Sequence, residues 1–366
     1  MDLLDGVIRS YDWGSATALA DLRGIEPTGA AEAELWFGAH PSGPSSFRHG
    51  GRDVTLNEMP FLVKVLAVDQ PLSLQVHPDA SAAAIGHRRE LAAGLAVDDR
   101  RRSHPDGRAK PEVICAIGRF ETLCGFRSVD VSVAVATSLC YPEAILDPLR
   151  RADWRAVVAA ALAASTDDVV AFVSAVGMVP DDRTDRSTAD LVLRLAGMYP
   201  VDPALLLVPL LRYLVLDDGE ALFVAPGVLH AHLSGLAVEV MAVSDDVVRA
   251  GLTPKHVDRD RVVELLGPVR SDEVEKAAGS VHRFAVGADA CTLWRLDGDD
   301  IEVYLDDRHG PELVLCTAGS ASVGVAGTDG PGLTVGPGEA AWIGPDDGPV
   351  RLRVDGTVHR VAVGKG

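Results

Sequence analysis

Polar residues at strand spacing in segment 71–78, PLSLQVHP, could hold a metal ion. Alternation along a strand puts Ser73, Gln75 and His77 on one face and the leucines and the valine on the other. A buried face of hydroxyl, amide and imidazole groups is costly unless those groups are satisfied. A metal ion would satisfy the glutamine oxygen and the imidazole nitrogen together. The same pattern is also typical of the solvated outer face of an antiparallel sheet.

Two other segments offer a carboxylate and imidazoles. Lys110 and Glu112 are two residues apart at the start of the apolar run VICAI, so they share one face of a strand. His230 and His232 follow a strand-like run and a Pro-Gly turn, again two residues apart. A charged strand start and a single histidine are both common without any function. Each segment alone is therefore weak support for a metal site.

Two cations stand out because the chain is acidic. There are 34 Lys and Arg against 53 Asp and Glu, a formal net charge of −19. Arg249 and Lys255 flank Gly251 and Pro254 in segment 247–255, VVRAGLTPK. This local positive charge favours an anionic ligand, with guanidinium suited to bidentate contact and ammonium to a point contact. The alternative is a solvated loop whose cations make surface ion pairs.

Length and composition favour a soluble globular protein with a sizeable core. The chain has 366 residues, of which 47% are hydrophobic and 24% charged. Its negative charge repels phosphate backbones and anionic membranes, so we expect no nucleic-acid or membrane partner. The longest wholly apolar run near the middle, residues 156–164, has nine residues. That is about half of the ~20 residues that span a bilayer.

The N-terminus and the cysteines indicate a cytoplasmic protein. Asp2 and Asp5 stand where a secretory signal would carry basic residues. The five cysteines form an odd, scattered set without CxxC spacing. This pattern predicts reduced thiols rather than a disulfide framework.

Residue composition and the secondary structure that it predicts change twice along the chain. Residues 1–126 mix Gly and Pro turns with short β-branched runs and are predicted to be mostly β. From residue 131 to about 216, long Ala, Leu and Val segments with charges at helical spacing predict helices. After residue 217, short strand-like runs separated by turns continue to the end, as in an all-β sandwich or barrel.

A short internal repeat indicates two related β units. Segment 219–226, GEALFVAP, is echoed by segment 338–345, GEAAWIGP, and both predict a turn, a strand and a proline stop. Such units recur in jelly rolls of the cupin kind, where a glycine turn leads into a strand at the barrel mouth. Only the first copy continues into histidines, so at most one of the two barrels should hold a metal.

Several ordered segments together carry a family resemblance. They are YDWGS with Trp13, AELWFGAHPSGPS with Glu34, PFLVKVLAVDQPLSLQVHPD, KPEVICAI, ETLCGFR and VVRAGLTPK. In this order they resemble the type I phosphomannose isomerases, zinc-dependent enzymes built from two cupin-like barrels and a helical insert. The resemblance covers most of residues 11–258. Agreement of many segments in order is far more specific than any one motif.

The resemblance implies a mainly β fold with two cupin-like jelly-roll barrels plus an α-helical domain. Residues 1–130 and 217–270 would form the catalytic barrel, 131–216 the helical insert and 271–366 a C-terminal barrel without metal. One zinc ion per chain would be held by Gln75, His77, Glu112 and His230. One carboxylate and neutral imidazoles leave such a site positive, which suits polarisation of a sugar carbonyl and hydroxyl.

The reaction that the resemblance implies is the reversible isomerisation of mannose 6-phosphate and fructose 6-phosphate through a cis-enediol. Arg249 would lie near the reacting carbons, with Lys255 and Ser73 on the phosphate side, and Trp13 and Glu34 would also bind substrate. The proton-transfer group stays open among three residues, namely Lys110, Glu239 and Asp245. The expected partner is a small sugar phosphate, and the chain would be a monomer or a weak homo-oligomer.

Other interpretations remain at this stage. A non-catalytic sugar-phosphate-binding protein could use the same scaffold, and an iron cupin oxygenase would favour a two-His, one-carboxylate triad without Gln75. His232 is interpreted as a wall or supporting residue rather than a ligand, and Ala109 stands where many relatives carry a histidine. The remaining histidines are expected at the surface, namely His40, His49, His87, His104, His256, His282, His309 and His359.

Overall fold

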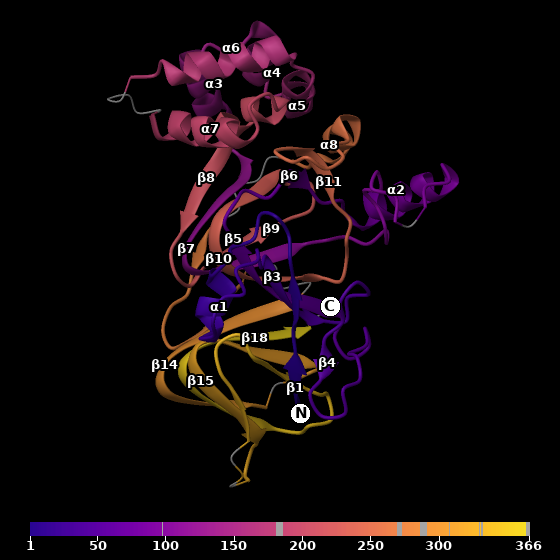
Figure 1. Cartoon of the computed structure of the whole chain (residues 1–366), viewed down its shortest axis with the longest axis vertical. Helices are drawn as coiled ribbons and strands as arrows, with labels where there is room; N and C mark the ends of the chain where they lie inside the picture. The colour runs from indigo at the N-terminus through magenta and orange to yellow at the C-terminus, as the bar shows by residue number, and fades with distance from the viewer. Residues whose placement is uncertain are drawn as a thin grey trace.

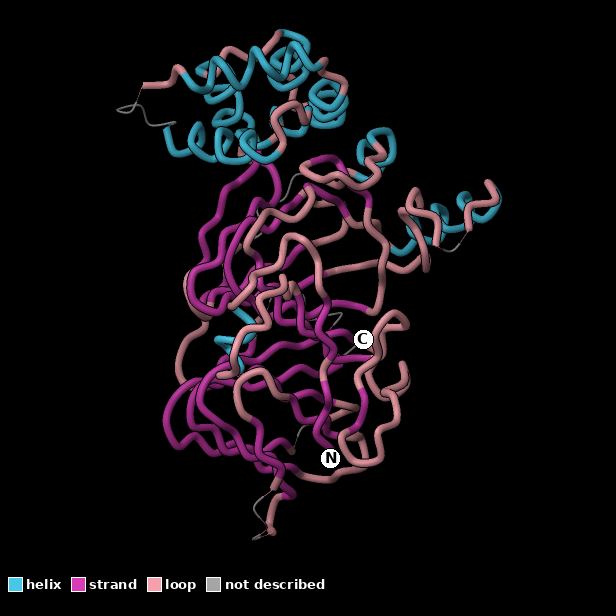
Figure 2. The backbone as a smooth tube through the Cα atoms, in the orientation of Figure 1, coloured by secondary structure: helices cyan, strands magenta, loops and turns pink. Residues whose placement is uncertain are grey.

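The structure, a computed structural model, is mostly β with its helices concentrated at one end. It describes residues 1–96, 98–180, 186–268, 273–285, 291–306, 308–328, 330 and 332–363. A helical bundle, a ten-stranded sheet and an eight-stranded sheet follow one another along the long axis (Figure 1). The tube view separates the helical end from the strand-rich remainder (Figure 2). The predicted mainly β chain with a helical insert is therefore confirmed at this level.

The ten-stranded sheet carries the segments that the sequence analysis singled out. Its path runs β12-β9-β7-β10-β5-β3-β2, with β6, β8 and β11 attached beside it. Within the described residues this path does not close on itself. The strands are β2 (Val7–Arg9), β3 (Glu34–Gly38), β5 (Phe61–Val68), β6 (Leu74–Val76), β7 (Glu112–Phe126), β8 (Leu211–Leu216), β9 (Glu220–Val224), β10 (His230–Ala242), β11 (Val248–Gly251) and β12 (Glu275–Lys276).

The eight-stranded sheet contains most of the C-terminal third and the extreme N-terminus. Its path runs β13-β14-β18-β15-β17-β1-β4, with β16 beside β15. The strands are β1 (Asp2–Asp5), β4 (Ser46–Phe47), β13 (Val281–Arg283), β14 (Cys291–Leu305), β15 (Glu312–Val325), β16 (Leu333–Val335), β17 (Ala340–Ile343) and β18 (Val350–Val363). β1 and β4 thus join this sheet, although the sequence analysis grouped residues 1–130 with the other one. Burial of Leu4 in an apolar cluster shared by both sheets explains this placement.

The internal repeat is confirmed as a structural repeat. Gly219 and Gly338 have φ of 74° and 76° and lead into β9 and β17. β9 pairs with β7 and β17 with β15, and the registers match because Glu112 lies opposite Val224 and Glu312 opposite Ile343. Val224 and Ile343 occupy the same position in the two repeat segments. Glu112 and Glu312 are therefore equivalent residues of the two sheets.

The helical block is close to its predicted position but ends earlier. It comprises α3 (Val129–Ser138), α4 (Glu143–Arg150), α5 (Trp154–Leu162), α6 (Thr166–Gly177), α7 (Arg186–Met198) and two short 3-10 turns, Pro203–Leu206 and Val208–Leu210. Leu211–Leu216 was expected to be helical and is instead strand β8, paired with β7. Pro203 and Pro209 interrupt helix formation just before it, and LRYLVL is rich in residues that favour a sheet surface.

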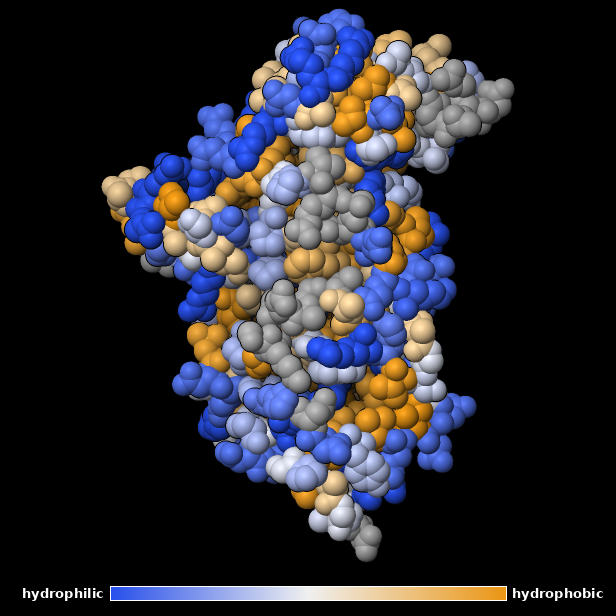
Figure 3. Space-filling model, turned by 180° about the vertical axis from the view of Figure 1, so that it is seen from behind, coloured by the Kyte–Doolittle hydropathy of each residue, from blue (hydrophilic) through white to orange (hydrophobic). Residues whose placement is uncertain are grey.

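No single helix among the described residues is long and apolar enough to cross a membrane. Only α5 and α6 taken as a pair meet the criteria of length and composition, and they are bent by 104° relative to each other. Seen from behind, the surface shows hydrophilic residues interspersed with smaller apolar patches (Figure 3). The five cysteines are free thiols.

Three helices lie in stretches predicted to be mostly β, namely α1 (Ala18–Arg23), α2 (Ala80–Ala92) and α8 (Arg259–Leu265). α2 begins at an N-cap, Asp79, whose side chain accepts a hydrogen bond from the Ala82 amide. Its alanine-rich sequence, ASAAAIGHRRELA, has high helix propensity. Figure 1 shows α2 standing away from the sheets. The helix begins three residues after His77 in the sequence.

Candidate metal centre and substrate pocket

Three expected ligands meet at one point of the ten-stranded sheet. His77 follows β6, Glu112 begins β7 and His230 begins β10, and all three are at most 1% exposed. Strand register brings them together because β10 lies beside β7 and its His230 is opposite Gln75 of β6. His77 Nε2 is 3.2 Å and His230 Nε2 is 3.6 Å from the two oxygens of Glu112. Their ligand atoms all lie within 4.8 Å of one another, close enough for one metal ion.

Backbone contacts direct both imidazoles at Glu112. His77 Nδ1 donates to the carbonyl oxygen of Asp246 at 2.9 Å, and His230 Nδ1 donates to that of Val228 at 3.0 Å. In the neutral form of the imidazoles, which metal ligation requires, both Nε2 atoms are acceptors and face a carboxylate that is also an acceptor. His77 Nε2 and both oxygens of Glu112 make no hydrogen bond of acceptable geometry within the described residues. A divalent cation fits this arrangement, because it would replace the repulsion between acceptors by ligation.

The protonation of the cluster also suits a metal. Burial, followed by the neighbouring His77, lowers the pKa of His230 to about 3, so this imidazole is neutral. Burial opposes ionisation of Glu112, but Lys110 and then His77 hold the pKa of Glu112 well below its ordinary value. Lys110 Nζ lies 2.8 Å from Glu112 Oε1. The site thus presents a carboxylate and a neutral imidazole, which are the ligand forms that metals require.

Gln75 lies at the edge of the cluster. Its Nε2 is 3.4 Å from His230 Nε2, and its Oε1 accepts a hydrogen bond from Ser73 Oγ at 3.0 Å. A half-turn of the amide would direct Oε1 to the cluster and let the NH2 group donate to Ser73, since a hydroxyl can accept as well as donate. The polar strand face predicted from segment 71–78 therefore does point at the candidate metal centre.

His232 lies behind Glu112 rather than with His77 and His230. It is 2% exposed, and its Nδ1 is 3.0 Å from Thr122 Oγ1. Its Nε2 forms a second possible group with Glu112 and Glu239. Two ammonium groups already neutralise that group, because Lys64 Nζ is 2.8 Å from Glu239 Oε2 and Lys110 lies beside Glu112. Each carboxylate of this second group therefore already has an ammonium group beside it.

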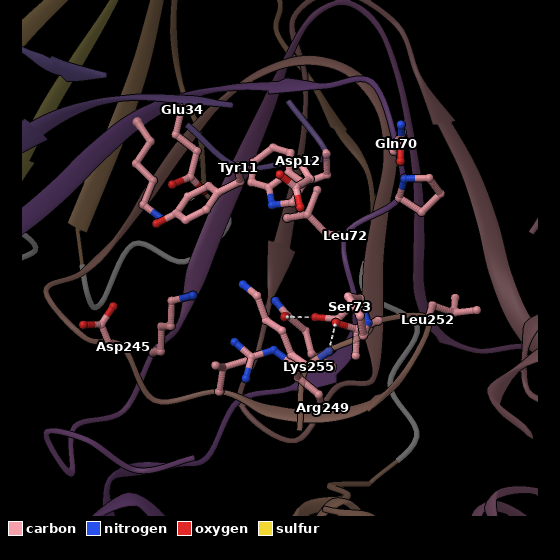
Figure 4. A pocket seen from close by; sticks show the side chains of 18 of the residues that line it. Tyr11, Asp12, Glu34, Gln70, Leu72, Ser73, Asp245, Arg249, Leu252 and Lys255 are labelled. Atoms are coloured by element: carbon pink, nitrogen blue, oxygen red, sulfur yellow. Dashed lines mark hydrogen bonds and ion pairs between the residues drawn. The ribbon is translucent and has the colours of Figure 1, made fainter. Parts of the chain in front are cut away.

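A cavity of about 840 Å³ opens next to the cluster. Figure 4 shows Tyr11, Asp12 and Glu34 on one side of this cavity and Asp245, Arg249 and Lys255 on the other. The lining includes the expected metal ligand Gln75. It also includes most residues expected to contact substrate or move a proton, namely Trp13, Glu34, Ser73, Lys110, Asp245, Arg249 and Lys255. Glu239 is the exception, since it is buried and paired with Lys64. Met198, the last residue of α7, and Tyr199 also line the cavity.

Arg249 and Lys255 face the cavity without an acidic partner. Among the described residues, neither forms an ion pair with a carboxylate, so the surface-pair interpretation is not supported. Burial lowers the pKa of Arg249, and burial followed by Arg249 lowers the pKa of Lys255. Lys255 Nζ lies 5.4 Å from the ring centre of Tyr11. Two unpaired cations on one wall are suited to an anionic group of a ligand.

Several residues of the pocket were missed or misplaced by sequence reasoning. His40 was expected at the surface, but it is 3% exposed, lines the cavity and places Nε2 3.2 Å from Asp245 Oδ1. Burial opposes ionisation of Asp245, while His40 is the main group that lowers its pKa. His104 and His359 were also expected at the surface and are 2% and 1% exposed. Their burial follows from long-range packing, for which a single histidine gives no sequence signal.

Lys64 was missed although the sequence does contain a signal for it. It is the one charged residue in the wholly buried strand β5, FLVKVLAV. Its ammonium lies between Glu239 at 2.8 Å and Glu34 at 3.7 Å, and Trp36 Nε1 donates to Glu34 at 2.7 Å. Burial would lower the pKa of Lys64, but Glu239 and then Glu34 raise it well above its ordinary value. A lysine inside an apolar strand is a marker of such a network.

The chain is similar to known proteins along its whole length. A family model for the catalytic domain of type I phosphomannose isomerases matches residues 1–59 and 50–129. The mannose-6-phosphate isomerases of Salmonella typhimurium and Escherichia coli are each 31% identical to the chain, with 99% of both chains covered. A zinc-bound crystal structure of mannose 6-phosphate isomerase aligns with a TM-score of 0.87 at 28% identity, covering 99% of each chain.

A second crystal structure, of the Salmonella typhimurium enzyme bound to its substrate fructose 6-phosphate and zinc, aligns with a TM-score of 0.85 at 28% identity. It covers 100% of this chain and 99% of the other. Both the sequence and the fold thus match the same proteins over their full length. The chain belongs to the type I phosphomannose isomerase family.

Proposed function

We propose that this protein interconverts mannose 6-phosphate and fructose 6-phosphate by moving a proton between C2 and C1 through a cis-enediol. The observation that carries the proposal is the buried His77–Glu112–His230 cluster beside a cavity walled by the unpaired cations Arg249 and Lys255. Crystal structures of relatives at this similarity bind zinc and fructose 6-phosphate. The chain offers the same two requirements, a cation site and an anion site, in one pocket.

His77, Glu112, His230 and Gln75 would hold the zinc ion, one per chain. Within the described residues, the buried His77 Nε2 and Glu112 oxygens make no hydrogen bond, which supports this assignment. Zinc, when bound, supplies positive charge that polarises a carbonyl and a hydroxyl and stabilises an enediolate. The glutamine supports a sugar isomerase over an iron oxygenase, whose facial triad needs only two histidines and one carboxylate.

Arg249 and Lys255 would contact different parts of the substrate. Arg249 lies opposite Gln75 in the β11–β6 register, which favours contact with the reacting end of the sugar. Lys255 and Ser73 line the same cavity and would bind the phosphate, with Trp13 and Glu34 contacting the sugar. Guanidinium can stabilise charge that develops on the enediolate oxygens, and ammonium can bind the constant charge of the phosphate.

Lys110 and Asp245 are better candidates for the proton-transfer group than Glu239. Lys110 and Asp245 line the cavity, whereas Glu239 lies behind it with its carboxylate 2.8 Å from Lys64. Lys110 also lies within 2.8 Å of the ligand Glu112, so its ammonium is next to the site where charge develops. His40 would hold the Asp245 carboxylate in the pocket. A proton-transfer group must reach the substrate, which favours the two lining residues.

We also propose that the two sheets are cupin-like jelly-roll barrels. The matched registers of the two repeat segments support this architecture. The catalytic barrel would comprise residues 1–130 and 217–270, apart from strands β1 and β4, which pair with the other sheet. Residues 131–216 would form the helical insert and 271–366 the metal-free barrel.

The proposal is tested by incubating the zinc-loaded protein with mannose 6-phosphate in deuterated water and following the sugar by proton NMR. We expect formation of fructose 6-phosphate together with exchange of solvent deuterium at the reacting carbon. Binding of mannose 6-phosphate without conversion and without exchange would instead support the non-catalytic sugar-phosphate-binding protein.

A further inference from the structure

The segment between His77 and Lys110 forms an arm that leaves the candidate metal centre and returns to it. It contains α2 and a loop that leads back to β7, and Figure 1 shows α2 projecting from the body of the molecule. Its two ends carry His77 on one side and Lys110 with Glu112 on the other. The arm therefore connects two of the expected ligands through more than thirty residues, and something must fix its conformation.

Asp246 joins the arm to the site. This residue is fully buried, and its backbone oxygen accepts the hydrogen bond from His77 Nδ1 at 2.9 Å. Its carboxylate accepts hydrogen bonds from the backbone amides of Asp106 and Gly107 at 3.2 Å each, and it lies 3.1 Å from His104 Nδ1. One residue thus contacts the metal-site imidazole through its carbonyl and the returning loop through its side chain.

The contacts of His104 define which nitrogen carries the proton. Arg261 Nε donates to His104 Nε2 at 3.1 Å, so Nε2 is the acceptor and Nδ1 carries the hydrogen that is donated to Asp246. The ring also packs directly against Gly86 of α2, where an added Cβ would lie 2.3 Å from it. α2, the loop and α8 therefore all hold His104 in the orientation that reaches Asp246.

We propose that Asp246 and His104 are positioning residues that fix the orientation of the metal ligand His77. The carboxylate contacts hold the Asp246 peptide, whose carbonyl sets the tautomer and the ring direction of His77. The inference rests on the proposed zinc-dependent function, since it needs His77 to be a ligand. Partners that orient a ligating histidine in this way typically change metal affinity by about 10–100-fold when removed.

Two substitutions of His104 separate its two hydrogen bonds. In His104→Asn the amide nitrogen replaces Nδ1 and can still donate to Asp246, while the contact with Arg261 is lost. In His104→Gln the longer side chain reaches the Nε2 position and loses the donation to Asp246. We expect the zinc dissociation constant, measured by chelator competition, to rise at least about tenfold for His104→Gln and to change little for His104→Asn. Asp246→Asn should resemble His104→Gln.

The visible spectrum of the cobalt-substituted protein gives a second readout, because it reports ligand geometry and is insensitive to a simple loss of stability. It should change in His104→Gln but not in His104→Asn or in the control Arg101→Ala, which removes an exposed pair with Asp99 in the same arm. Lower melting temperatures with unchanged zinc affinity and cobalt spectrum in all variants would overturn the inference and leave the proposed function intact. A wild-type protein that binds no zinc would overturn both.

Discussion

Glu112 and Glu312 occupy the same position in the two sheets, yet they have different surroundings. Glu112 faces two imidazole nitrogens. Lys110 Nζ lies 2.8 Å from its Oε1, but neither oxygen makes a hydrogen bond of acceptable geometry within the described residues. Glu312 accepts two hydrogen bonds of 2.7 Å from the guanidinium of Arg360, and Arg308 Nε lies 3.7 Å away. Both carboxylates are buried, at 1% exposure.

The difference shows that a carboxylate at one position of this sheet can either contribute to a metal site or form a buried ion pair. In the C-terminal sheet, a guanidinium satisfies the carboxylate bidentately, so no cation is needed. In the ten-stranded sheet, the histidines leave acceptor atoms facing one another, an arrangement that a metal completes. Arg360 lies opposite Val314 as Glu239 lies opposite Ile114, so the guanidinium comes from the strand position of Glu239. A carboxylate satisfied in this way needs no metal ion, which agrees with our proposal of one zinc per chain.

The largest expected effect comes from removing a proposed ligand. His230→Ala should abolish zinc retention after dialysis and abolish isomerase activity, because a direct ligand contributes to the coordination free energy. His232→Phe is the matched control two residues away, and it should retain most of the zinc. Metal analysis of both dialysed variants measures this, and equal loss of zinc would make His232 a ligand as well.

The next effect separates the two cations of the cavity. Arg249→Ala should lower kcat by roughly 10² or more with little change in KM, if it stabilises charge present only in the transition state. Lys255→Ala should raise KM by about tenfold with kcat less affected, because the phosphate charge is constant throughout the reaction. Steady-state kinetics on mannose 6-phosphate measures both. An effect of Arg249→Ala on KM alone would move this residue to the phosphate site.

Breaking the arginine pair of the other sheet should affect stability and not chemistry. Arg360→Met leaves Glu312 buried without its bidentate partner, a change that typically costs about 3–5 kcal/mol of unfolding free energy. Zinc content and kcat of the folded variant should match the wild type. Urea unfolding measures the stability, and metal analysis measures the zinc content. Loss of zinc in the folded variant would show that zinc binding in one sheet depends on the ion pair in the other.

The smallest effect concerns His359 in the C-terminal sheet. Burial, followed by Arg295, lowers its pKa to about 3, whereas an unfolded histidine titrates near 6.5. Between these values the unfolded chain binds more protons, so this contribution to stability is present above pH 6.5 and is lost as the pH falls toward 3. From pH 7 to pH 5 the wild type should lose about 2 kcal/mol more than His359→Gln. Equal pH dependence of unfolding in the two proteins would contradict the assignment.

Sequence reasoning predicted the local features of the site better than its surroundings. The strand face of Ser73, Gln75 and His77 and the pairing of Lys110 with Glu112 follow from spacing two residues apart, which the backbone fixes locally. The contact of His40 with Asp245 and the contact between His104 and Asp246 depend on segments far apart in the chain. No periodicity in either segment encodes such contacts.

The same distinction applies to the fold. The repeat strands β9 and β17 were predictable because each lies between a glycine turn and a proline. Helix α2 was not, because its helical signal is its alanine content and the Asp79 cap rather than an apolar stripe. Strand β8 follows from pairing with β7, a tertiary contact that overrides the leucine-rich helical pattern.

The central claim is that the Glu112 end of the molecule holds one zinc and the Glu312 end holds none. The most direct test is the zinc content of dialysed protein, measured together with conversion of mannose 6-phosphate, for the wild type and for Glu112→Gln and Arg360→Met. We predict about one zinc and full activity for the wild type and for folded Arg360→Met, and neither zinc nor activity for Glu112→Gln. Two tightly held zinc ions in the wild type, or zinc retained by Glu112→Gln, would contradict the account.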